Sequence, residues 1–351
     1  MKIIRKLLPV LLALAMVLGL AACGSSTDTT PAGSDTETVS NTNAAAQELK
    51  LSTAWGENSS VQQGAEKFKE LLEAASDGRF TVTIYPSDQL ASGNQISAIE
   101  MVQTGATELD LRGFVLYSTL DPRATVVNMP FIMPTTEDVD EIFFNGEGSK
   151  ALDGVVEDLG LQPLAWGEAG YRQITNSVKE ITSPEDMVGL KFRIPSMPMF
   201  NDLYSIIGTN PTTINMGEVF TALQQGVVDG QENAVDTALS YKIQEVQSYM
   251  TCWNGVYDPL LFSASPAFWA TLSAEDQQMF LDCAAEAMRY QVEQNRQTEQ
   301  EIWDTFEEAG CHVTHLTDEQ IAAFQEATKP LYDQWADRIG DDLFAAFGYS
   351  K

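Results

Sequence analysis

Two arginines stand in apolar, strand-like segments of a chain that has only 20 lysines and arginines. Arg172 lies in the segment WGEAGYRQIT, and Arg193 lies in LKFRIPS. A guanidinium in such surroundings needs an anionic partner, which is either a buried protein carboxylate or an anionic ligand. Because the planar guanidinium can hold a carboxylate through two parallel hydrogen bonds, it suits an organic acid. The residues alone leave both interpretations open, a structural ion pair and a ligand contact.

The stretch LQQGVVDGQEN, residues 223–233, places three polar residues in an otherwise apolar setting. Its pattern predicts a helix that Gly226 stops, followed by a short strand and then a cleft. A shorter echo occurs at residues 103–110, where a helix, a glycine and a strand follow in the same order. Either this echo arises by chance or the chain has two similarly built lobes.

Other kinds of chemistry find little support in the residue pattern. Both histidines, His312 and His315, lie in CHVTH beside Cys311. This trio could imitate a metal cluster, but the alternating segment follows a helix stop and predicts a strand. Two histidines disfavour a Ser-His-Asp triad, and no glycine-rich phosphate loop occurs. We therefore expect no metal and no cofactor, whereas the 50 Asp and Glu residues leave a paired-carboxylate enzyme open.

The N-terminus has the features of an export signal. Three cationic residues precede the apolar run Leu7–Leu20, which is short for a membrane span and has the form of a secretory signal. The signal ends in LAAC, and this ending resembles the lipobox of bacterial lipoproteins, in which the cysteine carries lipid. The next stretch contains no aromatic residue and predicts a flexible tether. We therefore predict a signal peptide at residues 1–22, a lipidated Cys23 with a tether over 23–47, and an extracytoplasmic body anchored at a cell surface or in a periplasm.

Composition limits the partners and the covalent cross-links. The formal net charge is -30, and such an acidic surface repels nucleic acid and anionic lipid. Membrane contact is therefore expected through the lipid anchor only. Beyond Cys23, three cysteines remain in a chain large enough to be stable without cross-links, so no disulfide framework is implied.

The body alternates short strands with amphipathic helices from residue 48 onward. The segments ELKLSTAW, SVQQGAEKFKELLEAAS and RFTVTIYP predict strand, helix and strand in turn. This order predicts an α/β protein with layers of helices on mostly parallel sheets. A helical run from about Ala274, with Ser273 as the capping residue, continues to a stop at Gly310. A helix of this length is unusual within one lobe, so we expect it to run between two.

The motif G-x-K-x-R-x-P, which contains Arg193, and the segment A-L-Q-x-G-x-V-D-G-Q-E-N closely resemble substrate-binding proteins of TRAP transporters, the DctP-like family. The resemblance extends from about Leu49 to the C-terminus. It implies a two-lobed, periplasmic-binding-protein-like α/β fold of type II, with the ligand cleft between the lobes and a long helix spanning both. It also implies lobe I at 48–169 plus about 259–298, and lobe II at 170–258 plus about 299–351.

The same resemblance implies residues of the ligand site. The strand arginine that forms the family's main salt bridge to the ligand carboxylate is here Arg193. The asparagine that reaches into the cleft is Asn233, and the helping arginine is Arg172. The resemblance thus implies that Val227 and Val228 enter the sheet and that the polar triplet of residues 231–233 emerges beyond that strand at the mouth of the cleft. Met216 stands where relatives that bind sialic acid have an aromatic residue, and Arg112 lies near the place of another cleft arginine.

Two tryptophans are further candidates for the ligand site. Trp55, at the end of the first predicted strand, is placed to stack on a ligand ring. Trp166 is the other. Both have an alternative interpretation as core residues, and for Trp166 the core is favoured.

These features predict a solute-binding protein that captures a small organic acid and delivers it, as a monomer and without catalysis, to the membrane subunits of a TRAP transporter. The tryptophans lean toward a sugar acid over a bare dicarboxylate. Two alternatives remain open. One is a sensory protein that presents its closed form to a receptor kinase, and the other is a secreted carbohydrate-active enzyme.

Overall fold

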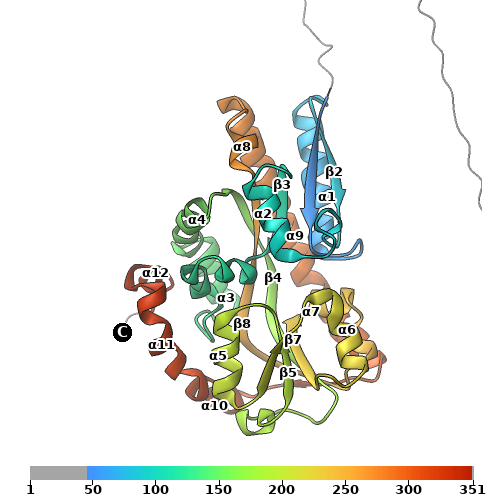
Figure 1. Cartoon of the computed structure of the whole chain (residues 1–351), viewed down its shortest axis with the longest axis vertical. Coiled ribbons are helices and arrows are strands. Elements are labelled where there is room, and N and C mark those ends of the chain that lie inside the picture. The colour runs from blue at the N-terminus through green and yellow to red at the C-terminus, as the bar shows by residue number, and fades with distance from the viewer. Residues whose placement is uncertain (1–45, 350–351) are drawn as a thin grey trace, which may run out of the picture. The chain divides into compact units, whose positions relative to one another are not determined.

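The computed structural model describes residues 46–349, and their strands form one nine-stranded mixed sheet (Figure 1). The predicted signal peptide, Cys23 and the tether up to residue 45 lie outside the described residues. The first strand begins at Gln47, which is the last residue of the predicted tether. The first described strand therefore starts almost where the composition changes.

The strands run in the order β2-β1-β3-β8-β4-β7-β5-β6, with β9 beside β8. Parallel pairs join β1 to β2 and β3, β5 to β6 and β7, and β8 to β9, whereas β8 is antiparallel to β3 and β4, and β4 is antiparallel to β7. The strand bounds are β1 Gln47–Thr53, β2 Phe80–Tyr85, β3 Leu109–Gly113, β4 Gln162–Asn176, β5 Lys191–Ile194, β6 Asn210–Thr213, β7 Gly230–Ala234, β8 Tyr249–Ala264 and β9 His312–His315.

The two long strands β4 and β8 hold the rest of the sheet together. They pair with each other from Gln162 and Ala264 at one end to Asn176 and Tyr249 at the other. Strand β3 joins β8 near the first end, and β7 joins β4 near the second (Figure 1). Two of the predicted lobe boundaries fall inside β4 and β8, close to two shifts in the pairing register of β4, and the third falls inside the helix Ala274–Glu308. The division into lobes at these residues stays a prediction.

Helices cover the sheet and bury three clusters of apolar side chains. One cluster packs α1 and the start of α9 on β1 to β3, and another packs α6, α7 and the end of α9 beside β8. The largest lies on β4, β5 and β8 under α4, α5 and α10 to α12. The helix bounds are α1 Ser60–Ala75, α2 Gln95–Gln103, α3 Thr136–Asp138, α4 Gly148–Asp158, α5 Pro198–Ile207, α6 Met216–Gln224, α7 Val235–Ser240, α8 Pro266–Trp269, α9 Ala274–Glu308, α10 Asp318–Thr328, α11 Pro330–Ile339 and α12 Asp341–Ala346.

The predicted long helix is confirmed as α9, which has 35 residues. The side chain of Ser273 caps its N-terminus by accepting a hydrogen bond from the backbone N–H of Asp276. Gly310 follows its C-terminus with a φ of +88°, a conformation that glycine adopts without a steric penalty. Helix α9 contacts α1 near one end of the sheet and α7 and β9 near the other. It therefore connects elements on both sides of the β4–β8 pair.

The polar triplet of residues 231–233 lies within a strand and not beyond one. Gly226 has a φ of +67° just after α6, so the predicted helix stop is confirmed. The predicted entry of the two valines into the sheet is wrong, because β7 begins at Gly230 and Val227 is 55% exposed. A Cβ atom at Gly230 would lie 2.4 Å from the Thr175 carbonyl oxygen. Only glycine permits this approach between β7 and β4 at the first residue of the strand.

Two other features bear on the sequence predictions. His312 and His315 lie in β9, which confirms the predicted strand. Cys252, Cys283 and Cys311 are buried free thiols. Within residues 46–349, no helix is both long enough and apolar enough to cross a membrane.

Candidate ligand-binding site

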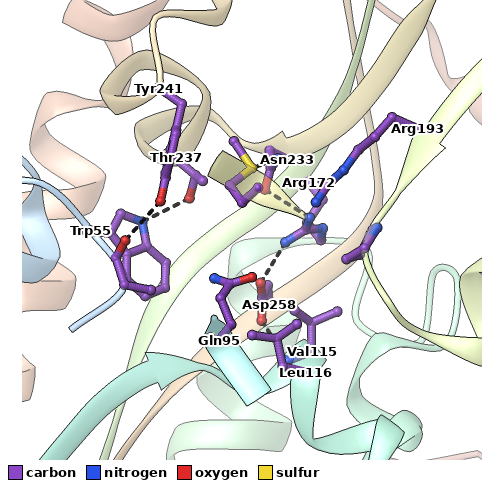
Figure 2. A pocket seen from close by; sticks show the side chains of 14 residues that line it. Trp55, Gln95, Val115, Leu116, Arg172, Arg193, Asn233, Thr237, Tyr241 and Asp258 are labelled. Carbon is purple, nitrogen blue, oxygen red and sulfur yellow. Dashed lines mark hydrogen bonds and ion pairs between the residues drawn. The ribbon is translucent and has the colours of Figure 1, made fainter. Parts of the chain in front are cut away.

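A cavity lies where β1, β3, β5 and β7 end beside the middle of β4 and β8 (Figure 2). The space between its walls that no protein atom fills, including the open mouth, is about 440 Å³. The lining residues are Ala54, Trp55, Gln95, Gly113, Val115, Leu116, Arg172, Arg193, Pro195, Met216, Asn233, Thr237, Tyr241 and Asp258.

Arg193 is a buried cation that has no ion pair with any residue in the range 46–349. It is 2% exposed, and its one hydrogen bond runs from Nε to the carbonyl oxygen of Ile214, at 2.9 Å. Burial lowers its pKa to about 10; the charge of Glu232 opposes this fall, and that of Arg172 adds to it. The group is still protonated at neutral pH. The two terminal amino groups of Arg193 are therefore available to an anion in the cavity.

Arg172, by contrast, is occupied by protein carboxylates. Its Nε and Nη2 donate to the carboxylate of Glu232, and its Nη1 donates to Asp258 Oδ2 at 2.8 Å. Burial alone would lower the pKa of Arg172, but the charges of Glu232 and Asp258 outweigh it and raise the pKa. Burial also raises the pKa of both carboxyl groups, even beside the guanidinium. Arg172 thus joins β4 to β7 and β8 as an ion-pair partner.

Asn233 and Met216 lie beside these charges, as the family motif implies. The side-chain oxygen of Asn233 accepts a hydrogen bond from Arg172 Nη2 at 2.9 Å, and its Nδ2 donates to Gln231 Oε1 at 2.7 Å. Met216 is 6% exposed and starts α6 at the cavity wall. The triplet in β7 therefore orients Arg172 and contributes one amide to the lining.

Trp55 forms another wall of the cavity. Its indole Nε1 donates to the Thr237 hydroxyl at 2.9 Å, which fixes the ring. Gly113 lies against this ring, since a Cβ atom there would be 3.4 Å from Trp55 Cη2 and 3.2 Å from Asp258 Oδ2. The ring is 6% exposed and also belongs to the apolar cluster on β1 to β3. Trp55 is therefore part of the core and also a wall of the cavity, and its stacking on a ligand ring stays a prediction.

Two predicted site residues do not line the cavity. Arg112 is fully buried and pairs with Asp110 at 2.8 Å and Asp88 at 2.7 Å. Because successive strand residues point to opposite faces, Gly113 at the cavity places Arg112 on the other side of β3. Trp166 packs edge to face against Phe114 and Phe143, and its Nε1 donates to Asp153 Oδ1. Trp166 is thus a partly buried residue that packs against the core, and it lies away from the cavity.

The sequence predictions missed several lining residues, above all Asp258. This aspartate lies in the apolar segment VYDPLLF, and it accepts a backbone hydrogen bond from Val115 besides the bond from Arg172. A carboxylate in an apolar strand needs a partner just as a guanidinium does, so the signal that singled out the arginines could have found it. Gln95, Thr237 and Tyr241 lie in or after polar helix turns and carry no such signal.

Comparison with known proteins assigns the chain to a protein family. Residues 51–338 match the family described as bacterial extracellular solute-binding protein, family 7, or DctP. The chain is 31% identical over 283 residues to the 2,3-diketo-L-gulonate-binding periplasmic protein YiaO of Escherichia coli K12, a match that covers 81% of this chain and 85% of YiaO.

Solved structures agree with this match. A TRAP periplasmic solute-binding protein from Polaromonas sp. JS666, bound to D-erythronate, has a TM-score of 0.81 and 30% identity over 87% of this chain and 99% of that one. Another, from Sulfurospirillum deleyianum with bound succinate, has a TM-score of 0.81 and 27% identity over 88% and 100%. The likeness confirms the predicted fold class. The chain belongs to the bacterial extracellular solute-binding protein family 7, the DctP family.

Proposed function

We propose that this protein is an extracytoplasmic solute-binding protein that captures a small organic acid and delivers it to a TRAP-type secondary transporter. The observation that carries the proposal is Arg193, a buried cation at the cavity that has no ion-pair partner in the described part of the chain. A buried charge without a partner is costly, and a ligand carboxylate would supply that partner. The carboxylate could accept two hydrogen bonds from the guanidinium in the bidentate geometry that makes such pairs strong.

The relatives support an organic acid as the ligand class. The name of YiaO states that it binds 2,3-diketo-L-gulonate, and the two solved structures contain D-erythronate and succinate. Each of these compounds carries at least one carboxylate. The group that these ligands share is therefore a carboxylate, which the Arg193 guanidinium is suited to hold.

The proposed mechanism is capture followed by closure and docking. The acid enters the open cavity, and its carboxylate loses bound water and pairs with the Arg193 guanidinium. The parts of the protein at the two ends of the sheet then close around the acid. The long strands β4 and β8 and helix α9 connect these ends, so they are the elements about which lobes at 48–169 plus 259–298 and 170–258 plus 299–351 would move. The closed monomer then docks on membrane subunits of the transporter. No step requires catalysis.

A thermal-shift screen tests the proposal. A ligand at 100 times its dissociation constant adds about 2.7 kcal/mol to the free energy of unfolding, so a true ligand gives a clear rise in Tm. The panel contains aldonates, uronates, sialic acid, keto acids and C4-dicarboxylates, and each aldonate is matched with its neutral polyol, for example D-erythronate with erythritol. We expect an acid to stabilise the protein, its polyol to leave Tm unchanged, and mass spectrometry to recover the acid unaltered. Stabilisation by polyols and by no acid, or turnover of the acid, would contradict the proposal.

We also propose that lipid on Cys23 holds the mature protein at the membrane, because LAAC directly follows the apolar run of the export signal. A mature protein that begins at Cys23 and carries acyl chains is the expected result of mass spectrometry on membrane-extracted material. Cys23→Ser should release the protein from the membrane fraction without changing ligand binding. An unmodified N-terminus at another residue would contradict this part of the proposal.

A further inference from the structure

We propose that Asp258 restricts the site to acids with a single carboxylate whose other polar groups are hydroxyls. This inference rests on the proposed function and names the ligand class of the same site. Asp258 is 2% exposed, lines the cavity and carries the only negative charge among its lining residues. It is therefore the group that a second ligand carboxylate would meet.

The charges around the cavity are balanced before any ligand binds. Arg172 and Arg193 are positive, Glu232 and Asp258 are negative, and all four are at most 4% exposed. Arg172 is held by both carboxylates, so Arg193 remains as the one guanidinium at the cavity wall, among residues 46–349, without an ion pair. One ligand carboxylate can pair with Arg193. A second carboxylate would enter a buried site that offers no further unpaired cation, and like charges in such a site repel each other strongly.

Asp258 is held in position and remains open to the cavity. Its Oδ2 accepts a hydrogen bond from Arg172 Nη1 at 2.8 Å, and its Oδ1 accepts one from the backbone N–H of Val115 at 3.2 Å. Gly113 has no side chain, so it leaves this carboxylate uncovered. A Cβ atom at position 113 would lie 3.2 Å from Asp258 Oδ2 and would crowd it. The backbone N–H of Phe114 also interacts with this carboxylate, and a carboxylate offers about four lone-pair directions, so one remains. Asp258 can therefore accept a further hydrogen bond from a ligand hydroxyl.

Neutral polar groups on the same walls also suit hydroxyls. The half-buried side chain of Gln95 makes no hydrogen bond to any residue that the structure describes, although its amide can both donate and accept. Thr237 accepts from Trp55, and its own hydroxyl proton has no acceptor within the described chain. In Figure 2, Gln95 and Trp55 lie across the cavity from Arg193. A hydroxy acid with its carboxylate on Arg193 would reach these groups with its hydroxyls.

Matched acids test the inference by calorimetry. Three pairs differ only in whether the far end is a hydroxymethyl group or a carboxylate: D-erythronate with meso-tartrate, D-gluconate with D-glucarate, and 4-hydroxybutyrate with succinate. We expect the tightest ligand among the six to be a monocarboxylate that binds at least tenfold more tightly than its diacid. A diacid that binds as tightly as its partner, or more tightly, would overturn the inference.

Two isosteric variants separate the position of the charge from its amount. Asp258→Asn removes the charge at the cavity wall. Glu232→Gln removes an equal charge from a residue that pairs with Arg172 but does not line the cavity. The measured quantity is the ratio of the dissociation constants of the diacid and its monoacid. We expect Asp258→Asn to lower this ratio at least fivefold, mainly because the diacid binds more tightly. We expect Glu232→Gln to lower the ratio less. An equal fall of this ratio in both variants, or an unchanged ratio in Asp258→Asn, would overturn the role of Asp258. If Asp258→Asn does not fold, the wild-type comparison of the three pairs still decides the ligand class.

The outcome also distinguishes this inference from the proposed function. Binding of none of the six compounds, together with binding of another acid from the wider screen, would overturn the inference alone. Failure of every acid in that screen would instead contradict the proposed function.

Discussion

Replacing Arg193 with alanine is expected to weaken binding of the acid by about 30- to 5,000-fold. This range corresponds to the roughly 2 to 5 kcal/mol lost when one partner of a buried charge pair is truncated. Arg193 has no carboxylate partner among residues 46–349, so the ligand carboxylate is the group that its removal leaves unpaired. Calorimetry with the acid identified in the screen measures the loss. Arg193→Lys should recover part of it, because the ammonium restores the charge but not the two-pronged geometry.

A control on the same strand makes this result specific. Lys191 lies two residues before Arg193 in β5 but is exposed, and it pairs with Asp229 at 3.1 Å. Lys191→Ala removes the same formal charge from the protein and should change the dissociation constant by less than twofold. Ligand-free Arg193→Ala should be at least as stable as the wild type, because the substitution removes a buried cation that lacks an ion pair. Binding of the acid by folded Arg193→Ala within about threefold of wild type would mean that Arg193 does not hold the ligand.

Arg172→Ala is expected to act first on stability, lowering the free energy of unfolding by about 3 to 5 kcal/mol. The substitution leaves the carboxylates of Glu232 and Asp258 buried without the cation that both contact. Urea denaturation of the ligand-free protein measures the change. Arg289→Ala, at an exposed position of α9, is the control and should stay within about 0.5 kcal/mol of wild type. We expect Arg172→Ala to weaken binding less than Arg193→Ala does in protein that remains folded.

The pH dependence of this loss has a defined sign. Burial already raises the pKa of Glu232 and Asp258, and the positive charge of Arg172 opposes that rise. Without Arg172 both pKa values rise further, so the folded variant binds more protons than the unfolded chain at pH values above about 4. Its stability therefore falls as the pH rises from that value through the raised pKa values. The deficit relative to wild type should be smaller at pH 5 than at pH 8, and a deficit below 1 kcal/mol at both would contradict the assigned ion pairs.

Local patterns predicted the framework well because their causes lie within a few residues. Ser273, the helical run and Gly310 marked α9, and Gly226 marked the end of α6. Capping and glycine conformation act over one helical turn, so the sequence displays them directly. The start of β7 was misplaced because the bounds of this strand follow from its pairing with β4, which is distant in the chain.

The candidate site was predicted in part, since charge partners are set by tertiary structure. Arg172 and Arg193 look alike in sequence, yet Arg172 has carboxylate partners 60 and 86 residues away and Arg193 has none in the described chain. Only the folded sheet shows which of the two arginines is paired with protein carboxylates, and the ligand contact of Arg193 stays a prediction. Arg112 was misplaced for a simpler reason, because Asp110 two residues earlier on the same strand face already supplies a partner.

A crystal structure of the complex with the identified acid measures most directly where the ligand carboxylate lies. We expect both carboxylate oxygens within about 2.7 to 3.1 Å of Arg193 nitrogens, with Arg172 still bound to Glu232 and Asp258. A carboxylate seated elsewhere, with Arg193 turned to a carboxylate of the protein itself, would contradict the account.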